Sequence, residues 1–358
     1  MTQARPLPIA ALTRRHFLAM VSAGAAAAAA FPAAAVAAPA GPIRVGLIGG
    51  DSDGISLLAR ALRADRGFRL VAIADEVDAR ARRALDIFTH HRRRGGPHPQ
   101  VEVGPGKVLA GADAAERLCA VEALDAVFVA GIPAYRSGHV SAAIAAGKHV
   151  FMLGPGAVDA VGCRALLGAA DRAEAAGLSI GVDLATTAAS LSSAAGIDVR
   201  WQRAPWRRFT PGGSAAQNWY FDEDLSGGVL LGDGFGVIDR INQLKGGPPL
   251  LGVGRLGDGP GEHAVAYRYP DGSLVTMRFH LGKGLASRFE ARLTDGSPLP
   301  PSSGDGTEAI GAFLEAIRSG RPDGWRPRLD RLVAATRTAL LGREAARLGR
   351  PLDWAEIA

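Results

Sequence analysis

The chain has 358 residues, of which 47% are apolar and 21% are charged, so it can bury a large core and is not intrinsically disordered. At about 150 residues per domain, this length allows two domains. Two cysteines exclude a disulfide scaffold and a cysteine-rich metal site. The net charge of +6 includes three arginines in the first 40 residues, which contain no acid. The excess elsewhere is too dispersed to indicate nucleic-acid binding.

Residues 1–38 have the pattern of an export signal. Arg14 and Arg15 precede an alanine-rich run broken by Pro32, and residues 35–37 (Ala-Val-Ala) form a small-x-small cleavage site. The arginine pair resembles a twin-arginine signal, so we expect export to the periplasm or another extracytoplasmic space, with cleavage near residue 38. The alternative is an uncleaved anchor, for which this run is a poor spanning helix. No other segment is apolar enough to span a membrane.

Residues 42–183 alternate short apolar, β-branched stretches with stretches of helical spacing. The predicted strands are residues 43–48, 68–74, 126–130, 149–152 and 178–182. The predicted helices between them are residues 55–64, 77–89, 137–146 and 159–176. This alternation predicts an α/β fold with a doubly wound parallel sheet of the Rossmann type, which binds ligands at the carboxyl ends of its strands.

The turn after the first predicted strand is where such a sheet would bind a dinucleotide. The G-x-G-x-x-G fingerprint here reads Gly49-x-Asp51-x-x-Gly54, with a carboxylate in place of the second glycine. Asp51 either repels a diphosphate from the helix N-terminus or simply caps the helix. Asp75 ends the second strand, where an acid binds the ribose of NAD and disfavours the 2′-phosphate of NADP.

Several separated segments share a pattern with a known family. They are residues 125–133 (DAVFVAGIP), His139, residues 146–155 (AGKHVFMLGP), residues 226–239 (SGGVLLGDGFGVID) and residues 342–346 (GREAA) with Gly349 and Trp354. In this order they resemble the glucose–fructose oxidoreductase, inositol dehydrogenase and MocA family. The resemblance implies an N-terminal Rossmann domain over residues 42–183. It also implies a C-terminal α/β domain over residues 184–358, with a large, mostly antiparallel open sheet and last helices that can pack back on the first domain.

The same resemblance implies a dehydrogenase of sugars or cyclitols with NAD(P) as cofactor. The residues that it places at the cofactor are Gly49, Asp51, Gly54, Asp75, Pro133 and Pro155. Independently of it, residues 264–269 and 274–279 alternate with period two around a turn at residues 270–273, which predicts a β-hairpin. A strand over residues 289–293 and helices over residues 308–319 and 328–348 complete the predicted second domain.

The departures from the family pattern fall on its catalytic residues. The resemblance places the family's lysine at Gly154, and its aspartate and histidine, four residues apart on one helix, at Gly232 and Gly236. Removing a single acid or base typically lowers a rate by about 10²–10⁴-fold. We expect the three glycines to converge on one enlarged cleft, into which the three side chains would fit back without steric penalty.

Other groups could replace the missing ones: Asp233, Asp183 and Tyr135, with Lys283 as a further candidate. The leading hypothesis is an exported, catalytically degenerate homologue that binds a carbohydrate or a dinucleotide, or that pairs with an active subunit. The alternative is an active NAD(P)-dependent carbohydrate oxidoreductase with non-standard residues. The open face of the second sheet offers a surface for a homo-oligomer. No metal site is expected, because no His/Asp/Glu cluster has ligand spacing.

Overall fold

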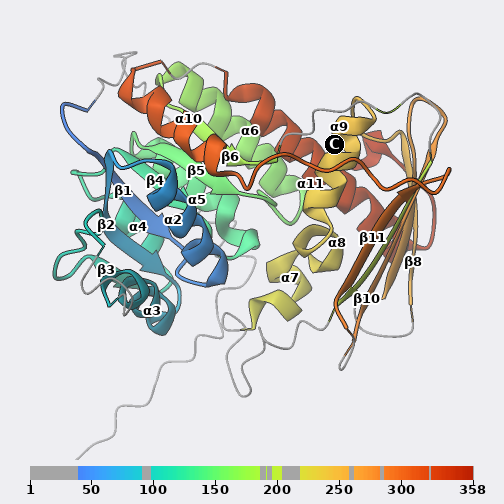
Figure 1. Ribbon diagram of the computed structural model, residues 1–358, viewed down its shortest axis with the longest axis horizontal. Coiled ribbons are helices and arrows are strands. Elements are labelled where there is room, and N and C mark those ends of the chain that lie inside the picture. The colour runs from blue at the N-terminus through green and yellow to red at the C-terminus, as the bar shows by residue number, and fades with distance from the viewer. Residues whose placement is uncertain are drawn as a thin grey trace, which may run out of the picture.

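The computed structural model describes residues 39–90, 98–185, 191, 196–203, 218–257, 262–282, 286–321 and 324–357. The predicted leader and Lys283 lie outside the described residues. Two six-stranded sheets stand at opposite ends of the molecule, with helices between them (Figure 1). None of the helices in the described part of the chain is long and apolar enough to cross a membrane.

The first sheet is parallel, with the strand order β3-β2-β1-β4-β5-β6. Its strands are β1 (Ile43–Ile48), β2 (Phe68–Asp75), β3 (Val108–Ala110), β4 (Ala126–Val129), β5 (His149–Leu153) and β6 (Ile180–Asp183). Its helices are α2 (Ser52–Ala64), α3 (Asp78–Thr89), α4 (Ala114–Cys119), α5 (Pro133–Ala145) and α6 (Ala160–Ala175). The order reverses between β1 and β4, which is the Rossmann arrangement with a ligand crevice at the switch point. The predicted fold class is confirmed.

Local sequence explains most of these boundaries. Strands β1, β2, β4 and β5 are apolar runs because helices cover both faces of the parallel sheet. Helix α5 begins at Pro133, four residues before the predicted start, because proline suits a first turn whose N–H groups lack helical acceptors. The short elements β3 and α4 were not predicted, since three and six residues are too few to show a period.

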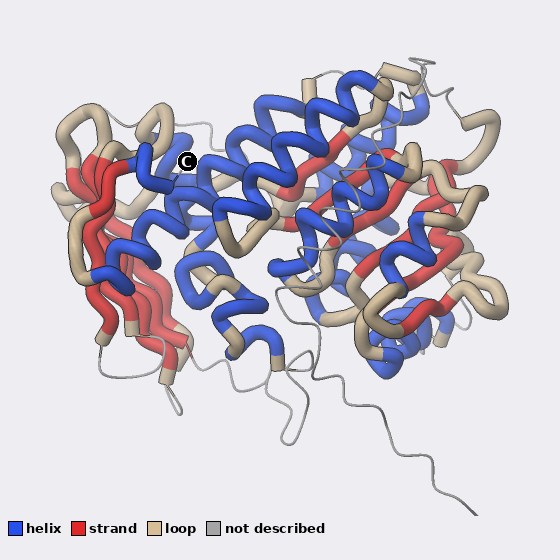
Figure 2. Tube along the Cα trace, turned by 180° about the vertical axis from the view of Figure 1, so that it is seen from behind, coloured by secondary structure: helices blue, strands red, loops and turns tan. Residues whose placement is uncertain are grey.

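The second sheet is mostly antiparallel, with the order β11-β7-β10-β9-β8-β12. Its strands are β7 (Ile197–Arg203), β8 (Leu251–Leu256), β9 (His263–Arg268), β10 (Leu274–Leu281), β11 (Arg288–Leu293) and β12 (Leu352–Asp353). Strands β9 and β10 form the predicted hairpin, and Gly272 takes the left-handed conformation that its turn requires. Helices α9 (Phe235–Leu244) and α11 (Arg326–Leu348) lie on one side of this sheet, whereas no helix of the described residues covers its other side (Figure 2).

Buried side-chain clusters connect the first sheet and its helices to the second sheet and its helices. Helix α10 (Thr307–Arg318) follows the second sheet in sequence but packs on α2 and β6 of the first domain. Its Phe313 lies against Phe128 and Phe151 of the parallel sheet. A second buried cluster runs from Val150 in β5 through α11 to Val199 in β7. This shared packing holds the crevice between the sheets in one arrangement.

The segment between the sheets contains the short helices α7 (Glu223–Ser226) and α8 (Gly228–Gly232), preceded by a 3₁₀ turn, Trp219–Phe221. The sequence predicted one helix that carries both Gly232 and Gly236. That prediction is wrong, because α8 ends at Gly232 and α9 begins at Phe235. Gly234, between them, passes so close to Leu230 and Phe279 that a Cβ there would lie 2.6 Å from the Leu230 carbonyl oxygen.

Candidate functional site

The glycine turn after β1 is built for close backbone packing. Gly49 has a φ of 99°, which favours glycine, and a Cβ there would overlap the backbone of Gly131. A Cβ at Gly54 would overlap the Gly49 carbonyl group. The first and third glycines of the fingerprint are therefore required by the turn itself, whatever it binds.

Carboxylates of the chain occupy the amides around this turn. Asp51 is the N-cap of α2, and its Oδ1 accepts hydrogen bonds from the amides of Asp53 (3.0 Å) and Gly54 (3.2 Å). Asp75 accepts from the Gly50 amide (2.7 Å) through Oδ2 and from the Val77 amide (2.8 Å) through Oδ1. Of the two roles open to Asp51, the structure shows the capping role. Three amides at the place where a Rossmann sheet offers N–H groups to a diphosphate already have anionic acceptors.

The same turn is rich in buried negative charge. Burial, followed by the charge of Asp53, raises the pKa of Asp51 to about 6. Burial, followed by the charge of Glu76, raises the pKa of Asp75 to about 6. Burial also raises the pKa of Glu76. A second anion at this turn would meet carboxylates that are already difficult to ionise.

Arg136 provides the buried positive charge of this region, and the sequence analysis missed it. The side chain is 1% exposed and donates hydrogen bonds to the carbonyls of Gly131 (2.8 Å) and Pro155 (3.0 Å). Its guanidinium group thus ties together the chain segments that follow β4 and β5. Pro133 begins α5, whose first turn leads to Arg136, so both predicted prolines lie beside this arginine. An arginine in the first turn of an amphipathic helix carries no sequence signal that distinguishes it from a surface residue.

A cavity of about 280 Å³ opens between the two domains at the carboxyl ends of β5 and β6. Its walls come from α2, from the segments that follow β5 and β6, from α9 and from the loop before α10. The lining residues are Asp53, Ser56, Arg60, Leu153, Gly154, Asp183, Leu184, Ala185, Phe235, Gly236, Asp239, Arg240 and Ser302. The sequence predicted that Gly154, Gly232 and Gly236 would converge on one cleft, and two of the three line this cavity.

The three glycines do not behave alike in this cleft. Gly154 and Gly236 both line the cavity, whereas Gly232 does not. A Cβ at Gly236 would meet nothing within 4 Å, and one at Gly232 would only touch Tyr220 at 3.9 Å. At Gly154, by contrast, a Cβ would overlap the ring of Phe235. The expectation that all three side chains fit back without steric penalty is therefore wrong at residue 154, because an aromatic ring fills that space.

Two of the residues proposed as replacement catalysts, Asp183 and Asp233, are already bonded to other side chains of the protein. Asp183 forms a two-pronged salt bridge with Arg60, at 2.8 and 2.6 Å, on the wall of the cavity. Asp233 is buried and is bound by both Arg203 and Tyr220. The oxygens of each carboxylate are thus already bonded to neighbouring side chains.

Tyr135 is half-buried beside His139, whose ring centre lies 6.2 Å away. Burial, followed by the charge of Glu76, raises the pKa of Tyr135 above its usual value, so its hydroxyl stays protonated at neutral pH. Burial lowers the pKa of His139 to about 4, which keeps its ring neutral. Tyr135 is not part of the cavity wall.

Asp239 and Arg331 form a buried salt bridge at the back of the cavity, at 2.9 Å. Burial nevertheless raises the pKa of Asp239 to about 6, despite the opposing charge of Arg331. Arg240, the next residue, donates to the Leu299 carbonyl (2.6 Å). The cleft therefore offers carboxylate acceptors and guanidinium donors on several walls, together with the edge of the Phe235 ring.

The described residues provide neither a metal-binding cluster nor a reactive cysteine. Within the described ranges, no group of three or more His, Cys, Asp and Glu side chains could hold a metal ion. Cys119 and Cys163 are buried free thiols, and burial raises the pKa of each to about 12. Both are thus protonated and unreactive at neutral pH.

Comparison with solved structures finds this fold in several dehydrogenases. GenD2 from gentamicin A biosynthesis, solved with NAD, is 15% identical with a TM-score of 0.61 over 90% of this chain and 99% of that one. The scyllo-inositol dehydrogenase of Lactobacillus casei is 14% identical, with a TM-score of 0.62 over 88% and 99%. The WlbA dehydrogenase of Bordetella pertussis, solved with NADH and UDP-GlcNAcA, is 13% identical, with a TM-score of 0.63 over 87% and 97%. No family model matches the chain, and no curated protein matches its sequence. The likeness establishes the fold.

Proposed function

We propose that the protein is an exported carbohydrate-binding protein built on a dehydrogenase fold, and that it does not itself transfer hydride. The observation that carries this proposal is the engagement of the glycine-turn amides by Asp51 and Asp75. Gly232 and Gly236, where the resemblance places the family's aspartate and histidine, are glycines with open space around them as well. Both observations support a protein in which neither cofactor binding nor proton transfer is retained.

The dinucleotide that the fold implies does not fit this turn well. Its diphosphate would have to displace Asp51 from the Asp53 and Gly54 amides, and it would then lie beside that carboxylate and Asp75. Two unit charges about 4 Å apart repel by about 1 kcal/mol in water and about 4 kcal/mol near a protein surface. We therefore infer weak or absent binding of NAD(P), and no catalytic step is assigned to it.

The cleft is suited to a polyhydroxylated ligand. Sugar hydroxyls both donate and accept hydrogen bonds, and the walls provide carboxylates of Asp53 and Asp239, the Arg60 guanidinium group and the hydroxyl of Ser56. A volume of about 280 Å³ is close to the lower end of ligand pockets, about 300 Å³. Structures with this fold include an aldose-aldose oxidoreductase from Caulobacter crescentus in complex with glycerol, which supports a small carbohydrate as the ligand.

Blocking the cavity tests the proposal. Gly236→Phe should project a ring into it, because residue 236 lines the cavity and a Cβ there meets open space. Gly232→Phe is the matched control, since residue 232 is equally open but does not line the cavity. Calorimetry against a panel of aldoses, ketoses and cyclitols should show one class that binds the wild type and the control but not Gly236→Phe.

Two outcomes would contradict the proposal. One is a panel in which no sugar binds at millimolar concentration. The other is reduction of added NAD or NADP by wild-type protein in the presence of a bound sugar, followed at 340 nm. That second result would establish the alternative of an active oxidoreductase with non-standard residues.

The export part of the proposal rests on the arginine pair in the leader. Replacing Arg14 and Arg15 together by lysine should retain the precursor in the cytoplasm, because the twin-arginine route reads the paired guanidinium groups. Fractionation of cells followed by immunoblotting measures this. Wild-type levels of the double variant outside the cytoplasm would exclude the twin-arginine route.

A further inference from the structure

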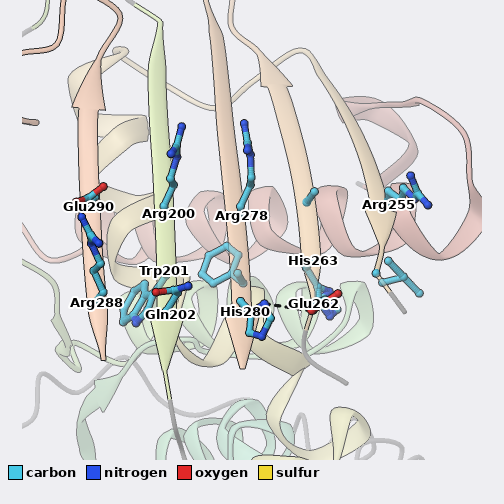
Figure 3. Close-up of a pocket in the computed structure, with 14 residues that line it drawn as sticks. Arg200, Trp201, Gln202, Arg255, Glu262, His263, Arg278, His280, Arg288 and Glu290 are labelled. Atoms are coloured by element: carbon cyan, nitrogen blue, oxygen red, sulfur yellow. Dashed lines mark hydrogen bonds and ion pairs between the residues drawn. The ribbon is translucent and has the colours of Figure 1, made fainter. Parts of the chain in front are cut away.

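The uncovered side of the second sheet carries a hollow of about 510 Å³, separate from the interdomain cleft. Figure 3 shows its lining side chains across five neighbouring strands, with Arg200 and Arg278 side by side. The lining residues are Arg200, Trp201, Gln202, Arg255, Leu256, Gly257, Glu262, His263, Ala264, Arg278, Phe279, His280, Arg288 and Glu290. Neither the proposed carbohydrate cleft nor the glycine turn includes any of them.

Strand register places a row of charged residues across this hollow. Arg200 of β7 pairs with Arg278 of β10, and on the other side with Glu290 of β11. Arg278 pairs with Ala264 of β9, which in turn pairs with Arg255 of β8. Because paired residues point to the same face of a sheet, these five form one row on the uncovered side. Ala264 is small, so the row dips between Arg278 and Arg255.

Arginines outnumber acids around this hollow: Arg200, Arg255, Arg278 and Arg288 line it, against Glu262 and Glu290. Glu262 lies 3.1 Å from His280, Glu290 binds Arg288 at 2.6 Å, and Asp198 binds Arg200 at 2.8 Å. Arg278 and Arg255 form no salt bridge with any residue that the structure describes. Like charges directly opposite each other on neighbouring strands are destabilising, and Asp198 offsets the repulsion between Arg200 and Arg278 only in part, so a further anion would stabilise this pair.

We propose that this hollow binds an acidic polysaccharide, whose carboxylates lie against Arg200, Arg278 and Arg255. Neighbouring strands are about 4.8 Å apart, so Arg255 stands about 10 Å from Arg278, two strands away. One carboxylate cannot span that distance, whereas a chain with regularly repeated carboxylates can bind both ends of the row. Guanidinium groups suit this ligand because they bind carboxylates through two parallel hydrogen bonds.

Other polymers fit this face less well. Single-stranded nucleic acids need aromatic side chains on which bases stack, and the row has none; the Trp201 ring instead stacks on the Phe279 ring, 6.1 Å away. Protein interfaces have apolar centres that are depleted in charge, whereas the centre of this hollow is Arg278 and Ala264. A second copy of this chain would present the same excess of arginine.

The test uses two double variants with the same change in charge. Arg200→Gln/Arg278→Gln removes the centre of the row, and Arg268→Gln/Arg292→Gln removes two exposed arginines of the same sheet that do not line the hollow. Calorimetry with oligogalacturonate, with neutral dextran as the control ligand, measures affinity at about 50 and 200 mM salt. We expect oligogalacturonate to bind the wild type, and the first variant to lose about tenfold or more. The second variant should lose less than about threefold.

Four results would overturn the proposal. The first is no binding of oligogalacturonate at the lower salt concentration, and the second is an equal loss in both double variants. The third is tighter binding of single-stranded DNA than of oligogalacturonate. If sedimentation shows a wild-type dimer that the first variant alone disrupts, the occupant is a second copy and the proposal also fails. Gly236→Phe, which blocks the interdomain cavity, should leave oligogalacturonate binding unchanged, so this test is independent of the proposed function.

Discussion

Two regions of the molecule differ in how the space around their backbone is occupied. In the glycine turn between β1 and α2, the carboxylates of Asp51 and Asp75 accept hydrogen bonds from the amides of Asp53, Gly54 and Gly50. At the end of α8 and the start of α9, by contrast, Gly232 and Gly236 present bare backbone to open space. One region is filled by the chain itself, whereas the other is empty.

Gly154 shows why this difference must be read from the structure. The resemblance places it with Gly232 and Gly236, as the third of three glycines at the family's catalytic positions. In space it is more like the glycine turn, since the Phe235 ring occupies the room that a side chain would need. A glycine in the sequence therefore does not show that the structure has room for a side chain at that position.

The filled turn gives the largest expected effect. Asp51→Asn keeps an oxygen that can cap α2, since asparagine caps about as well as aspartate, but it removes the charge. Affinity for NAD should rise by about 1–4 kcal/mol, which is about fivefold to several hundredfold. Asp51→Gly should bind at least as tightly, because it also frees both amides, with a loss of a few tenths of a kcal/mol in stability.

Calorimetry with NAD measures these affinities, and Asp86→Asn, an exposed acid on α3, is the control for net charge. If Asp51→Asn binds no better than wild type, the carboxylate is not what closes the turn. The charge of Asp51 would then not be what distinguishes the glycine turn from the open backbone at Gly232 and Gly236.

Gly154→Ala gives the next largest effect, now on stability. The new Cβ must push the Phe235 ring aside, and overpacking of this kind typically costs about 1–3 kcal/mol. At about 2.1 cal/mol/K per residue, each kcal/mol corresponds to roughly 1–2 °C in a chain of this length, so a thermal unfolding scan can measure the loss. Adding Phe235→Leu should recover part of the loss, because the two residues are in contact and their effects are not additive. Equal unfolding midpoints for wild type and Gly154→Ala would show that the ring is not fixed there.

The fold could be predicted from the sequence to a large extent, because it depends on patterns within short segments. Alternating strands and helices gave the parallel sheet, and the period-two stretches on either side of residues 270–273 gave the β9–β10 hairpin. Strand β8 escaped prediction because two glycines, Gly252 and Gly254, interrupt its apolar positions. Strand β7 does alternate apolar and polar residues, with the sequence IDVRWQR, so it carried a strand signal that was not used.

The site was less predictable because its contacts join residues that are distant in the chain. Arg60 and Asp183 are 123 positions apart, so no local pattern shows that Asp183 is already paired. The overlap of Phe235 with Gly154 likewise depends on how α9 lies against the end of β5. The cap made by Asp51 was one of two readings of a single turn, and only the geometry of its side chain separates them.

The pH dependence of dinucleotide binding is a smaller effect at the same turn. The pKa values of Asp51 and Asp75 are raised to about 6, mainly by burial. Both groups are therefore charged at pH 8 and mostly neutral at pH 5, so the affinity for NAD should increase as the pH falls through 6. The increase in affinity for NAD cannot exceed the increase expected from removing both charges. Asp51→Asn should reduce the pH dependence, because it removes one of the two titrating groups. Titrations at pH 5 and pH 8 measure it; an affinity that decreases towards pH 5 contradicts this charge assignment.

The smallest expected effect belongs to the empty region. Gly236→Ala places a methyl group where no atom lies within 4 Å, in the first turn of α9. Alanine is favoured over glycine in helices by up to about 1 kcal/mol, and less near an end, so stability should rise by a few tenths of a kcal/mol. Gly227→Ala is the contrasting variant, because Gly227 has a φ of 81° and alanine there is strained by about 1 kcal/mol or more. Chemical denaturation measures whether each variant gains or loses free energy of unfolding.

Because Gly236→Ala adds only one methyl group, a loss of stability in that variant would mean that other atoms cover this face of α9, as the Phe235 ring covers Gly154. The bare helix face would then be a second filled region, and a side chain as large as histidine would not fit at residue 236 unless the covering group moved.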